Sequence, residues 1–157
     1  MGANIRSTAK AILIRDGKVL VNRCMGERIG EYYSLPGGGQ NRFEPLEDAV
    51  RRECLEETGL HVNVLRLAAV CEEIWDSPKM REAHPDYCHR LLHIFLCEVD
   101  ESYQPEEAKE LDYQMIESVW VPLEDIDTLP LEPRPLTHRL RAVLDGTAPL
   151  FLGTVHC

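Results

Sequence analysis

The sequence lacks any run of about 18 apolar residues, the length that a helix needs to cross a lipid bilayer. Nor do residues 1–7 show the charged stretch followed by an apolar stretch that is typical of a secretory signal peptide. These absences argue against a membrane-spanning protein and against secretion. We therefore expect no membrane partner and a cytoplasmic location.

No pair of cysteines has the C-x-x-C spacing, although the sequence contains six cysteines. Neither a zinc ribbon nor a dithiol redox motif is indicated, and reduced, mostly buried thiols are expected. Four residues lie close enough in sequence to suggest a transition-metal site, namely His84, Cys88, His89 and His93. Their segment has the pattern of a strand, however, in which residues four positions apart are about 13 Å apart. The spacing thus disfavours a metal site there.

The sequence also shows no basic stripe, and its formal net charge at pH 7 is −10. Nucleic-acid binding relies on lysine and arginine side chains that neutralise backbone phosphates, so this composition argues against a nucleic-acid partner. An acidic protein can still bind a pyrophosphate if metal ions screen the repulsion between the substrate and the carboxylates. Any phosphate chemistry is therefore expected to depend on metal.

What is present is the composition of an ordinary globular protein, with 44% hydrophobic and 28% charged residues. The length of 157 residues is typical of one domain with a core of its own. No internal repeat or low-complexity segment is visible. We expect a single domain that spans residues 1–157.

A helix is predicted at 45–58, because a proline suits its first position and a glycine follows its last. Within this helix Glu53, Glu56 and Glu57 stand at i, i+3 and i+4, which makes their carboxylates neighbours on one surface. The pattern therefore gathers three negative charges in a small area.

Two of these glutamates, Glu53 and Glu57, fall within the apolar stripe that contains Val50 and Cys54. An ordinary amphipathic helix carries its charges on the opposite face. A solvated acidic face with arginine partners is the alternative, but half-buried like charges are costly unless a cation neutralises them. Because hard ions such as Mg²⁺ prefer carboxylate oxygens, the pattern predicts a divalent-metal site.

Gly38, Glu44 and the run 52–60 resemble the Nudix box, G-x5-E-x7-R-E-U-x-E-E-x-G-U, in which U is aliphatic. Every specified position but one matches. The exception is Cys54, a small apolar side chain in place of an aliphatic one. The loop before the helix also departs from the frequent Glu-Pro-Gly-Glu, because residues 41–44 are Asn-Arg-Phe-Glu.

Two further stretches, 35–39 and 120–123, resemble features of the same family, so the likeness spans most of the chain. The resemblance implies an α/β protein with the Nudix-type α/β/α sandwich around a mixed central sheet. It also implies a Mg²⁺- or Mn²⁺-dependent pyrophosphohydrolase that acts on a small-molecule nucleoside diphosphate linked to another moiety. Nucleoside triphosphates, nucleotide sugars and ADP-ribose are substrates of this type.

The resemblance further implies a set of metal ligands, which are Gly38 through a nearby backbone carbonyl, Glu44 as an outer ligand, Glu53, Glu56 and Glu57. The catalytic residues that it implies are Arg52, Glu53, Glu56 and Glu57. Arg52 would orient a glutamate through a charge-assisted hydrogen bond. Glu56 or Glu57 is the expected base for the attacking water, and Glu107 or Glu110 is the second option.

Substrate contacts are assigned to Arg23, Tyr33 and Trp75, because aromatic rings can stack on any nucleobase and a cation can bind phosphate. Isolated aromatic residues are also frequent in cores, so both interpretations stay open. The positions after the box that separate substrate groups in the family, here 75–78, match no group. The sequence leaves the exact substrate undetermined.

Two alternatives to a hydrolase remain. A non-catalytic nucleotide-sensing module of the same fold would use the cleft without cleavage, but such modules tend to lose carboxylates of the box, and none is missing here. An isoprenoid diphosphate isomerase would need a catalytic cysteine in the cleft, whereas Cys54 is on the packing side of its helix.

The other elements are expected as strands at 8–15 and 18–23 joined by Asp16-Gly17, an extended piece at 32–35, strands at 61–74, 87–99 and 118–121, and helices at 123–129 and 136–144. Two segments, 75–86 and 100–114, are expected to be loops. The tail at 149–155 suits either a final strand or a contact in a homodimer.

Overall fold

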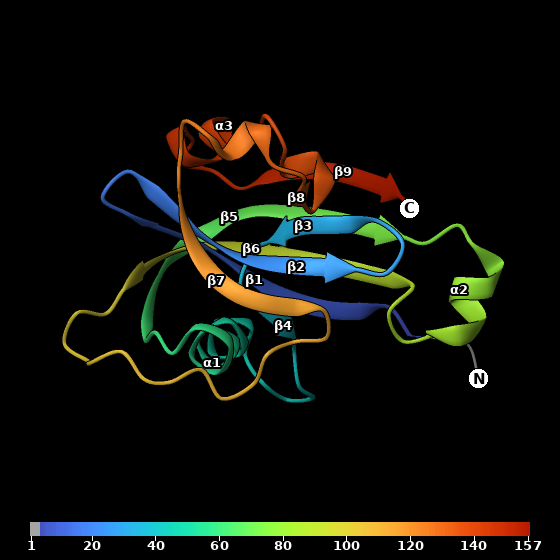
Figure 1. Cartoon of the computed structure of the whole chain (residues 1–157), viewed down its shortest axis with the longest axis horizontal. Helices are drawn as coiled ribbons and strands as arrows, with labels where there is room; N and C mark the ends of the chain where they lie inside the picture. Colours follow the sequence, from blue (N-terminus) through green and yellow to red (C-terminus); the bar gives the residue numbers. More distant parts are fainter. Residues whose placement is uncertain (1–3) are drawn as a thin grey trace.

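The computed structural model describes residues 4–157, which form a nine-stranded sheet with helices on both sides (Figure 1). The strands are β1 (Arg6–Arg15), β2 (Lys18–Gly26), β3 (Gly30–Ser34), β4 (Gly37–Gly39), β5 (Val62–Ile74), β6 (His89–Val99), β7 (Met115–Pro122), β8 (Leu131–Glu132) and β9 (Leu150–His156). The helices are α1 (Leu46–Thr58), α2 (Pro78–Ala83) and α3 (Leu140–Asp145), with the 3-10 turns η1 (Ile126–Thr128) and η2 (Arg134–Leu136).

The strands pair in the order β8-β3-β2-β1-β6-β5-β9, while β4 pairs with β1 and β7 pairs with β2. The β1–β6 and β5–β9 pairs are parallel, whereas β5–β6 and β2–β3 are antiparallel. The sheet is therefore mixed, as expected from the sequence.

The first two strands form the predicted hairpin. Asp16 and Gly17 have φ angles of 52° and 73°, as a two-residue turn between twisted strands requires. Only the residue pairs next to the turn, such as Ile14 with Val19, are in β1–β2 register. Beyond them β1 leaves β2 and pairs with β4 and β6. This divergence lets β1 contribute to a cavity farther along.

Alternate residues of β1 reach two different cores, because successive side chains of a strand point to opposite faces. Ala11 and Leu13 belong to a cluster with Val50 and Cys54 of α1. Ile12 belongs to the other cluster, which includes Leu140 and Val143 of α3. Helices thus cover both faces of the sheet, and the expected α/β/α sandwich is confirmed (Figure 1).

Helix α1 has the predicted limits within one residue. Pro45 precedes it, and Gly59 ends it in the left-handed conformation with φ 72°. Its buried residues are Ala49, Val50, Cys54 and Glu57. The unusual position of a glutamate in the apolar stripe is therefore confirmed for Glu57.

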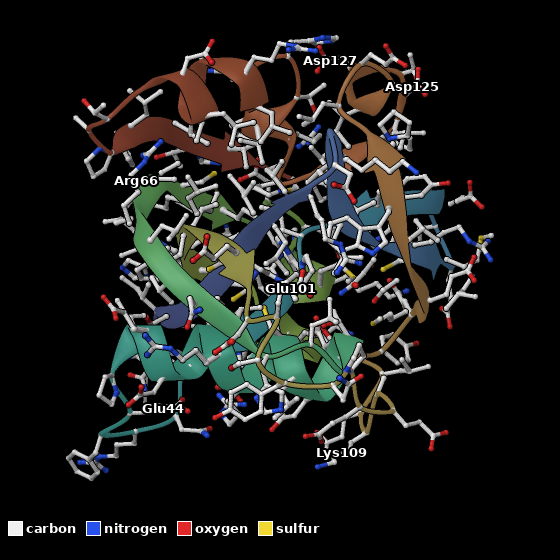
Figure 2. The ribbon with its side chains drawn as sticks, turned by 90° about the vertical axis from the view of Figure 1, so that its left-hand side faces the viewer. Glu44, Arg66, Glu101, Lys109, Asp125 and Asp127 are labelled. Carbon is white, nitrogen blue, oxygen red and sulfur yellow. The ribbon has the colours of Figure 1, made fainter. Side chains whose placement is uncertain are left out.

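Helix α3 is held against β5 by Arg66, which donates to the carbonyl oxygens of Val143 (2.8 Å) and Gly146 (2.6 Å) at the end of the helix (Figure 2). This places a cation where the carbonyl groups of a helix end lack partners. The helix ends before Gly146, as predicted, but it begins only at Leu140. His138 has a positive φ of 62°, which is not a helical backbone conformation, so the helix cannot extend back through this residue.

Two other expectations need correction, and a third, which left two alternatives open, is resolved as a strand. The loop expected at 75–86 contains α2, because Ser77 accepts a hydrogen bond from the Met80 amide at its start. The helix expected at 123–129 is only the 3-10 turn η1. The tail, left open as a strand or an oligomer contact, forms β9 alongside β5.

No helix among residues 4–157 is long and apolar enough to cross a membrane. The six cysteines are free, and all except Cys157 are buried, as expected. Cys54, in particular, is fully buried in the core under α1. It is therefore unsuited to the exposed catalytic role that an isomerase would require.

Candidate active site

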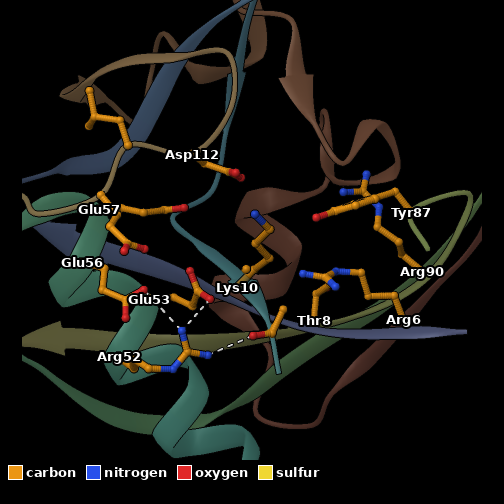
Figure 3. Close-up of a pocket in the computed structure, with 14 residues that line it drawn as sticks. Arg6, Thr8, Lys10, Arg52, Glu53, Glu56, Glu57, Tyr87, Arg90 and Asp112 are labelled. Atoms are coloured by element: carbon orange, nitrogen blue, oxygen red, sulfur yellow. Dashed lines mark hydrogen bonds and ion pairs between the residues drawn. The ribbon is translucent and has the colours of Figure 1, made fainter. Parts of the chain in front are cut away.

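A cavity of about 300 Å³ lies between α1, the start of β1, β4, and the loop that precedes β7 (Figure 3). Its lining residues are Arg6, Thr8, Lys10, Gly38, Gly39, Arg52, Glu53, Glu56, Glu57, Tyr87, Arg90, Glu110, Leu111 and Asp112. The set combines acidic and basic side chains from segments that are distant in the sequence.

The glutamates predicted from the helical spacing lie together along one side of this cavity. Figure 3 shows Glu53, Glu56 and Glu57 projecting from α1 on the side opposite Arg6 and Arg90. Helix periodicity placed the three carboxylates on one surface, and the packing of α1 against β1 and β4 turns that surface toward the cavity.

Arg52 joins the carboxylates of this wall into one network. Its Nε and Nη2 donate to the two oxygens of Glu44 at 2.7 and 2.9 Å, a bidentate pair. Its Nη1 donates to Glu53 at 2.8 Å and to Glu56 at 3.3 Å, and Nη2 also donates to the Gly39 carbonyl at 2.9 Å. These hydrogen bonds, led by those to Glu44, raise the pKa of Arg52 and keep it charged.

Glu44 lies just before the start of α1, as Figure 2 shows, and is not among the lining residues of the cavity. Its second oxygen also accepts the Asn41 amide at 2.8 Å. The Arg52 guanidinium lowers the pKa of the Glu44 carboxyl. In this arrangement Glu44 contacts Arg52, so its role as an outer ligand stays a prediction.

Glu57 is buried, and its hydrogen bonds orient it. Asn22 Nδ2 at 2.8 Å and the Gly37 amide at 3.0 Å both donate to Oε2. Within residues 4–157, no hydrogen bond reaches Oε1, which keeps its lone pairs for a cation. Burial raises the pKa of Glu57 to about 7, while the nearby Lys10 ammonium opposes that rise. The charge on Glu57 is therefore costly unless another cation approaches.

Glu53 approaches the glycines of β4 closely. A Cβ atom at Gly38 would lie 2.6 Å from Glu53 Oε2, a distance that no side chain could tolerate without displacement of the carboxylate. Burial raises the pKa of Glu53, and its hydrogen bond from Arg52 opposes the rise. The glycine at position 38 therefore lets the Glu53 carboxylate lie directly against the backbone of β4.

The donor set suits a hard divalent cation, because carboxylate oxygens and a backbone carbonyl at a cavity are the ligands that such an ion takes. No group of three or more His, Cys, Asp or Glu side chains in residues 4–157 is already arranged around a common point for a metal. Arg52 instead contacts oxygens of both Glu53 and Glu56. The residues fit a metal chemically, and the ligand assignment stays a prediction.

The part of the opposite wall that β1 contributes was not identified from the sequence. Arg6, Thr8 and Lys10 come from alternate positions of β1, and Arg90 comes from β6. Lys10 Nζ donates to the carbonyl oxygens of Gly37 at 2.7 Å and Leu35 at 3.3 Å. The signal in the sequence was Lys10, which is flanked by two alanines within an apolar strand. A charge in such a strand rarely lacks a partner, so this lysine indicated a site nearby.

The loop at 100–114 contributes Glu110, Leu111 and Asp112 to the cavity. Glu107 is not among the lining residues in the described chain, and Glu106 instead contacts His61 at 2.9 Å. Of the two residues proposed as a second option for the base, the structure therefore brings only Glu110 to the cavity.

The three residues predicted to contact substrate lie elsewhere. Arg23 pairs with Glu117 at 2.9 Å on the exposed surface, and Tyr33 donates to Glu31 at 3.0 Å. Trp75 contacts the ring of His84 near α2. None of the three lines the cavity among the residues that the structure describes. Their β-strand and loop neighbours direct them away, so a role in substrate contact stays a prediction.

Comparison with known proteins agrees with this geometry. The family model described as the NUDIX domain matches residues 5–140. A comparison with curated proteins found no match.

Several solved structures share the fold. A NUDIX hydrolase from Nitrosomonas europaea is 18% identical, with a TM-score of 0.69 over 90% of this chain and 88% of that one. An ADP-ribose pyrophosphatase from Streptococcus suis 89-1591 is 20% identical, with a TM-score of 0.61 over 94% of this chain and 99% of that one.

A MutT NUDIX hydrolase from Burkholderia pseudomallei is 27% identical, with a TM-score of 0.60 over 92% of this chain and 99% of that one. The family match covers the box, the strands around it and the cavity that they form. The chain therefore belongs to the NUDIX domain family.

Proposed function

We propose that this protein is a Mg²⁺-dependent hydrolase that cleaves the pyrophosphate bond of a nucleoside diphosphate derivative. The observation that carries the proposal is the convergence of Glu53, Glu56 and Glu57 on one cavity that also presents cationic side chains. Such a cavity can hold metal ions on one wall and phosphate oxygens on the other. Mn²⁺ is an alternative ion with similar ligand preferences.

Divalent ions at the glutamates would neutralise phosphoryl oxygens and lower the pKa of an attacking water molecule. The residues proposed to hold them are Glu53, Glu56, Glu57 and the carbonyl at Gly38, with Glu44 farther out. The fit rests on the carboxylate-rich donor set, on the Glu57 Oε1 that receives no hydrogen bond within residues 4–157, and on the space left by the absent side chain at Gly38.

The protein's own contribution is to hold these groups in position. Arg52 fixes Glu53 and Glu56 through Nη1, and Asn22 and the Gly37 amide fix Glu57. Preorganised groups of this kind need little rearrangement when charge develops during the reaction. We propose Glu56 as the base for the attacking water, because it is more exposed than Glu57 and lines the same cavity.

Glu110 is the competing base, because the loop at 100–114 brings it to the cavity. Substitution of each residue by glutamine separates the two. If Glu56 is the base, Glu56→Gln lowers kcat by several orders of magnitude while Glu110→Gln has a small effect. A larger loss in Glu110→Gln would reverse the assignment.

The structural neighbours named ADP-ribose pyrophosphatase and MutT NUDIX hydrolase support a nucleotide substrate for this chain. The experiment is incubation of the purified protein with nucleoside triphosphates, nucleotide sugars, dinucleoside polyphosphates and ADP-ribose. Products are separated by ion-exchange chromatography. We expect a nucleoside monophosphate to be released only when Mg²⁺ or Mn²⁺ is added.

The metal requirement has its own control. Addition of a chelator should stop turnover, and an excess of Mg²⁺ should restore it. Turnover that persists after exhaustive chelation and desalting would remove the metal mechanism. Tight nucleotide binding without turnover of any substrate would instead support a nucleotide-sensing module.

A further inference from the structure

Two arginines stand side by side at one end of the cavity. Arg6 of β1 and Arg90 of β6 are directly opposite each other in the parallel β1–β6 register, and both line the cavity. Like charges at directly opposite positions of neighbouring strands are destabilising. A negatively charged group near the two guanidinium groups would therefore be stabilising.

The described residues supply only part of that compensation. Glu73 of β5, opposite Arg90 in the β5–β6 register, is buried and forms an ion pair with it. The buried Nε of Arg90 nevertheless has no hydrogen-bond partner among residues 4–157. Arg6 forms no ion pair within the same residues, and its guanidinium carbon instead lies 4.7 Å from the centre of the Tyr87 ring. Glu73 thus compensates Arg90, whereas no carboxylate among residues 4–157 pairs with Arg6.

The position of Arg6 also depends on the glycines of β4. A Cβ atom at Gly39 would lie 2.2 Å from Arg6 Nη2 and 2.7 Å from its guanidinium carbon. The guanidinium therefore lies close against the backbone of β4, at a position that has no side chain. Tyr87 and Gly39 together orient a cationic group in a polar cavity.

The arginine pair is separated from the glutamates. Arg6, Thr8 and Lys10 alternate along β1, so about 13 Å of strand separates Arg6 from Lys10. Lys10 is the member next to the glutamates, because its ammonium donates to the Gly37 carbonyl and opposes the rise that burial causes in the pKa of Glu57. Figure 3 shows Arg6 and Arg90 on the far side of Lys10 from the glutamates.

We propose that Arg6 and Arg90 bind the terminal phosphate group of the substrate, so that the enzyme prefers nucleoside triphosphates to nucleotide sugars. This inference rests on the proposed function. A terminal phosphate offers charged oxygens that match the planar fork of arginine, and charge-assisted hydrogen bonds are roughly twice as strong as neutral ones. The hydroxyl groups of a sugar would leave the positive charge of Arg6 uncompensated.

The test compares UTP with UDP-glucose, which share a base and differ in the group beyond the second phosphate. We expect the native enzyme to have the higher kcat/KM for UTP. Arg6→Gln should lower kcat/KM for UTP by about 10- to 100-fold, the effect of losing hydrogen bonds to a charged group. The same variant should change kcat/KM for UDP-glucose by less than about 3-fold, because no charged oxygen is bound there.

Arg15→Gln is the matched control. Arg15 is on the same strand but at its other end, where it lies over the Trp120 ring and pairs with Glu101, and it does not line the cavity. The substitution changes the net charge by the same amount and should leave both substrates unaffected. Gly39→Ala provides a second variant, because its methyl group should displace the Arg6 guanidinium and lower UTP turnover without removing a charge.

A binding measurement separates this inference from the proposed hydrolase. Calorimetric titration with inorganic tripolyphosphate in the presence of Mg²⁺ should show weaker binding for Arg6→Gln than for Arg15→Gln. If no nucleotide of the substrate screen is cleaved but this difference is found, the proposed hydrolase function is wrong and the phosphate subsite is supported. Equal binding by the two variants, or equal losses for UTP and UDP-glucose in Arg6→Gln, would overturn the subsite.

Discussion

At the scale of single residues, Arg52 makes five hydrogen bonds, to Glu44, Glu53, Glu56 and the Gly39 carbonyl. A guanidinium group has five N–H donors, so this side chain has none left over. A lysine in its place offers three donors from a single nitrogen and cannot bind Glu44 in a bidentate manner. The network therefore requires arginine, rather than positive charge alone.

We expect Arg52→Lys to lower kcat by at least about 10-fold, because Glu53 and Glu56 lose their common partner and their fixed positions. Far-UV circular dichroism should stay unchanged, since no core residue is altered. Arg51→Lys is the control on the neighbouring position, where the side chain is partly exposed and, within residues 4–157, pairs with Glu47 and Asp48. Full turnover in Arg52→Lys would show that the network has no part in catalysis.

Glu57 links the site to stability through its ionisation. Its pKa in the folded protein is raised to about 7, chiefly by burial, from the ordinary value of 4.5. Below pH 4.5 the carboxyl is protonated in both the folded and the unfolded chain, so the residue imposes no penalty. As the pH rises through 4.5 toward 7, the unfolded chain ionises first and folding stability falls. At pH 8 the charged Glu57 should therefore lower the free energy of unfolding of the metal-free protein, relative to the same protein with a neutral residue at this position.

Glu57→Gln should remove that penalty. In the presence of a chelator, the variant should match the native protein near pH 4 and be more stable near pH 8, by up to about 3 kcal/mol. Melting curves at the two pH values measure the difference, and addition of Mg²⁺ should stabilise the variant less than the native protein.

The control for this prediction is Glu47→Gln, an exposed residue of the same helix that pairs with Arg51. It should show no comparable dependence on pH. If Glu57→Gln instead loses several kcal/mol without metal and keeps the full response to Mg²⁺, Glu57 is a structural partner and not a metal ligand.

At the scale of elements, the end of α1 positions the loop at 100–114. The Glu106 amide donates to the Gly59 carbonyl at 2.8 Å, and the amides of Lys109 and Glu110 donate to the Glu56 carbonyl at 2.9 and 3.1 Å. Figure 2 shows Lys109 in this loop near one end of α1 and Glu44 near the other. The free carbonyl groups at the helix end therefore hold the loop that brings Glu110 to the cavity.

Gly59→Ala should disturb this contact. The residue has a φ of 72°, and an added Cβ would lie 1.8 Å from the Glu106 carbonyl oxygen. We expect a loss of about 2–5 kcal/mol in the free energy of unfolding, from backbone strain together with the steric clash. Turnover should also fall, because the loop must move.

Gly17→Ala separates the two causes. Gly17 has nearly the same φ, 73°, but no atom of residues 4–157 lies within 4 Å of its added Cβ. Urea denaturation should show a loss of only about 1–2 kcal/mol for this variant, with unchanged turnover. Equal losses for Gly59→Ala and Gly17→Ala would mean that the loop contact does not matter.

At the scale of the whole molecule, β1 connects every part of the site. Its turn end pairs with β2, while its other end lies between β4 and β6. It thereby places the Gly38 backbone opposite Ala9 and the basic side chains of β1 opposite the glutamates of α1. The curled sheet between two helical layers brings a local motif and three distant segments into one cavity (Figures 1 and 3).

The sequence by itself determined the features that depend on near neighbours. The i, i+3 and i+4 spacing of Glu53, Glu56 and Glu57 was enough to place them on one surface, because helical geometry relates residues a few positions apart. The Asp16-Gly17 turn and the end of α1 at Gly59 followed from backbone preferences that are equally local. The burial of Glu57 could be read in the same way, from its position in an apolar stripe.

Only the tertiary structure decided which distant residues complete the site. The register that sets Arg6 beside Arg90 joins strands from opposite halves of the chain, and no local preference specifies it. Arg23, Tyr33 and Trp75 had suitable chemistry, yet the strands and loops that carry them direct them away from the cavity. Long-range contacts form through the packing of whole elements, so the direction of a side chain far from the motif follows from how the sheet closes around it.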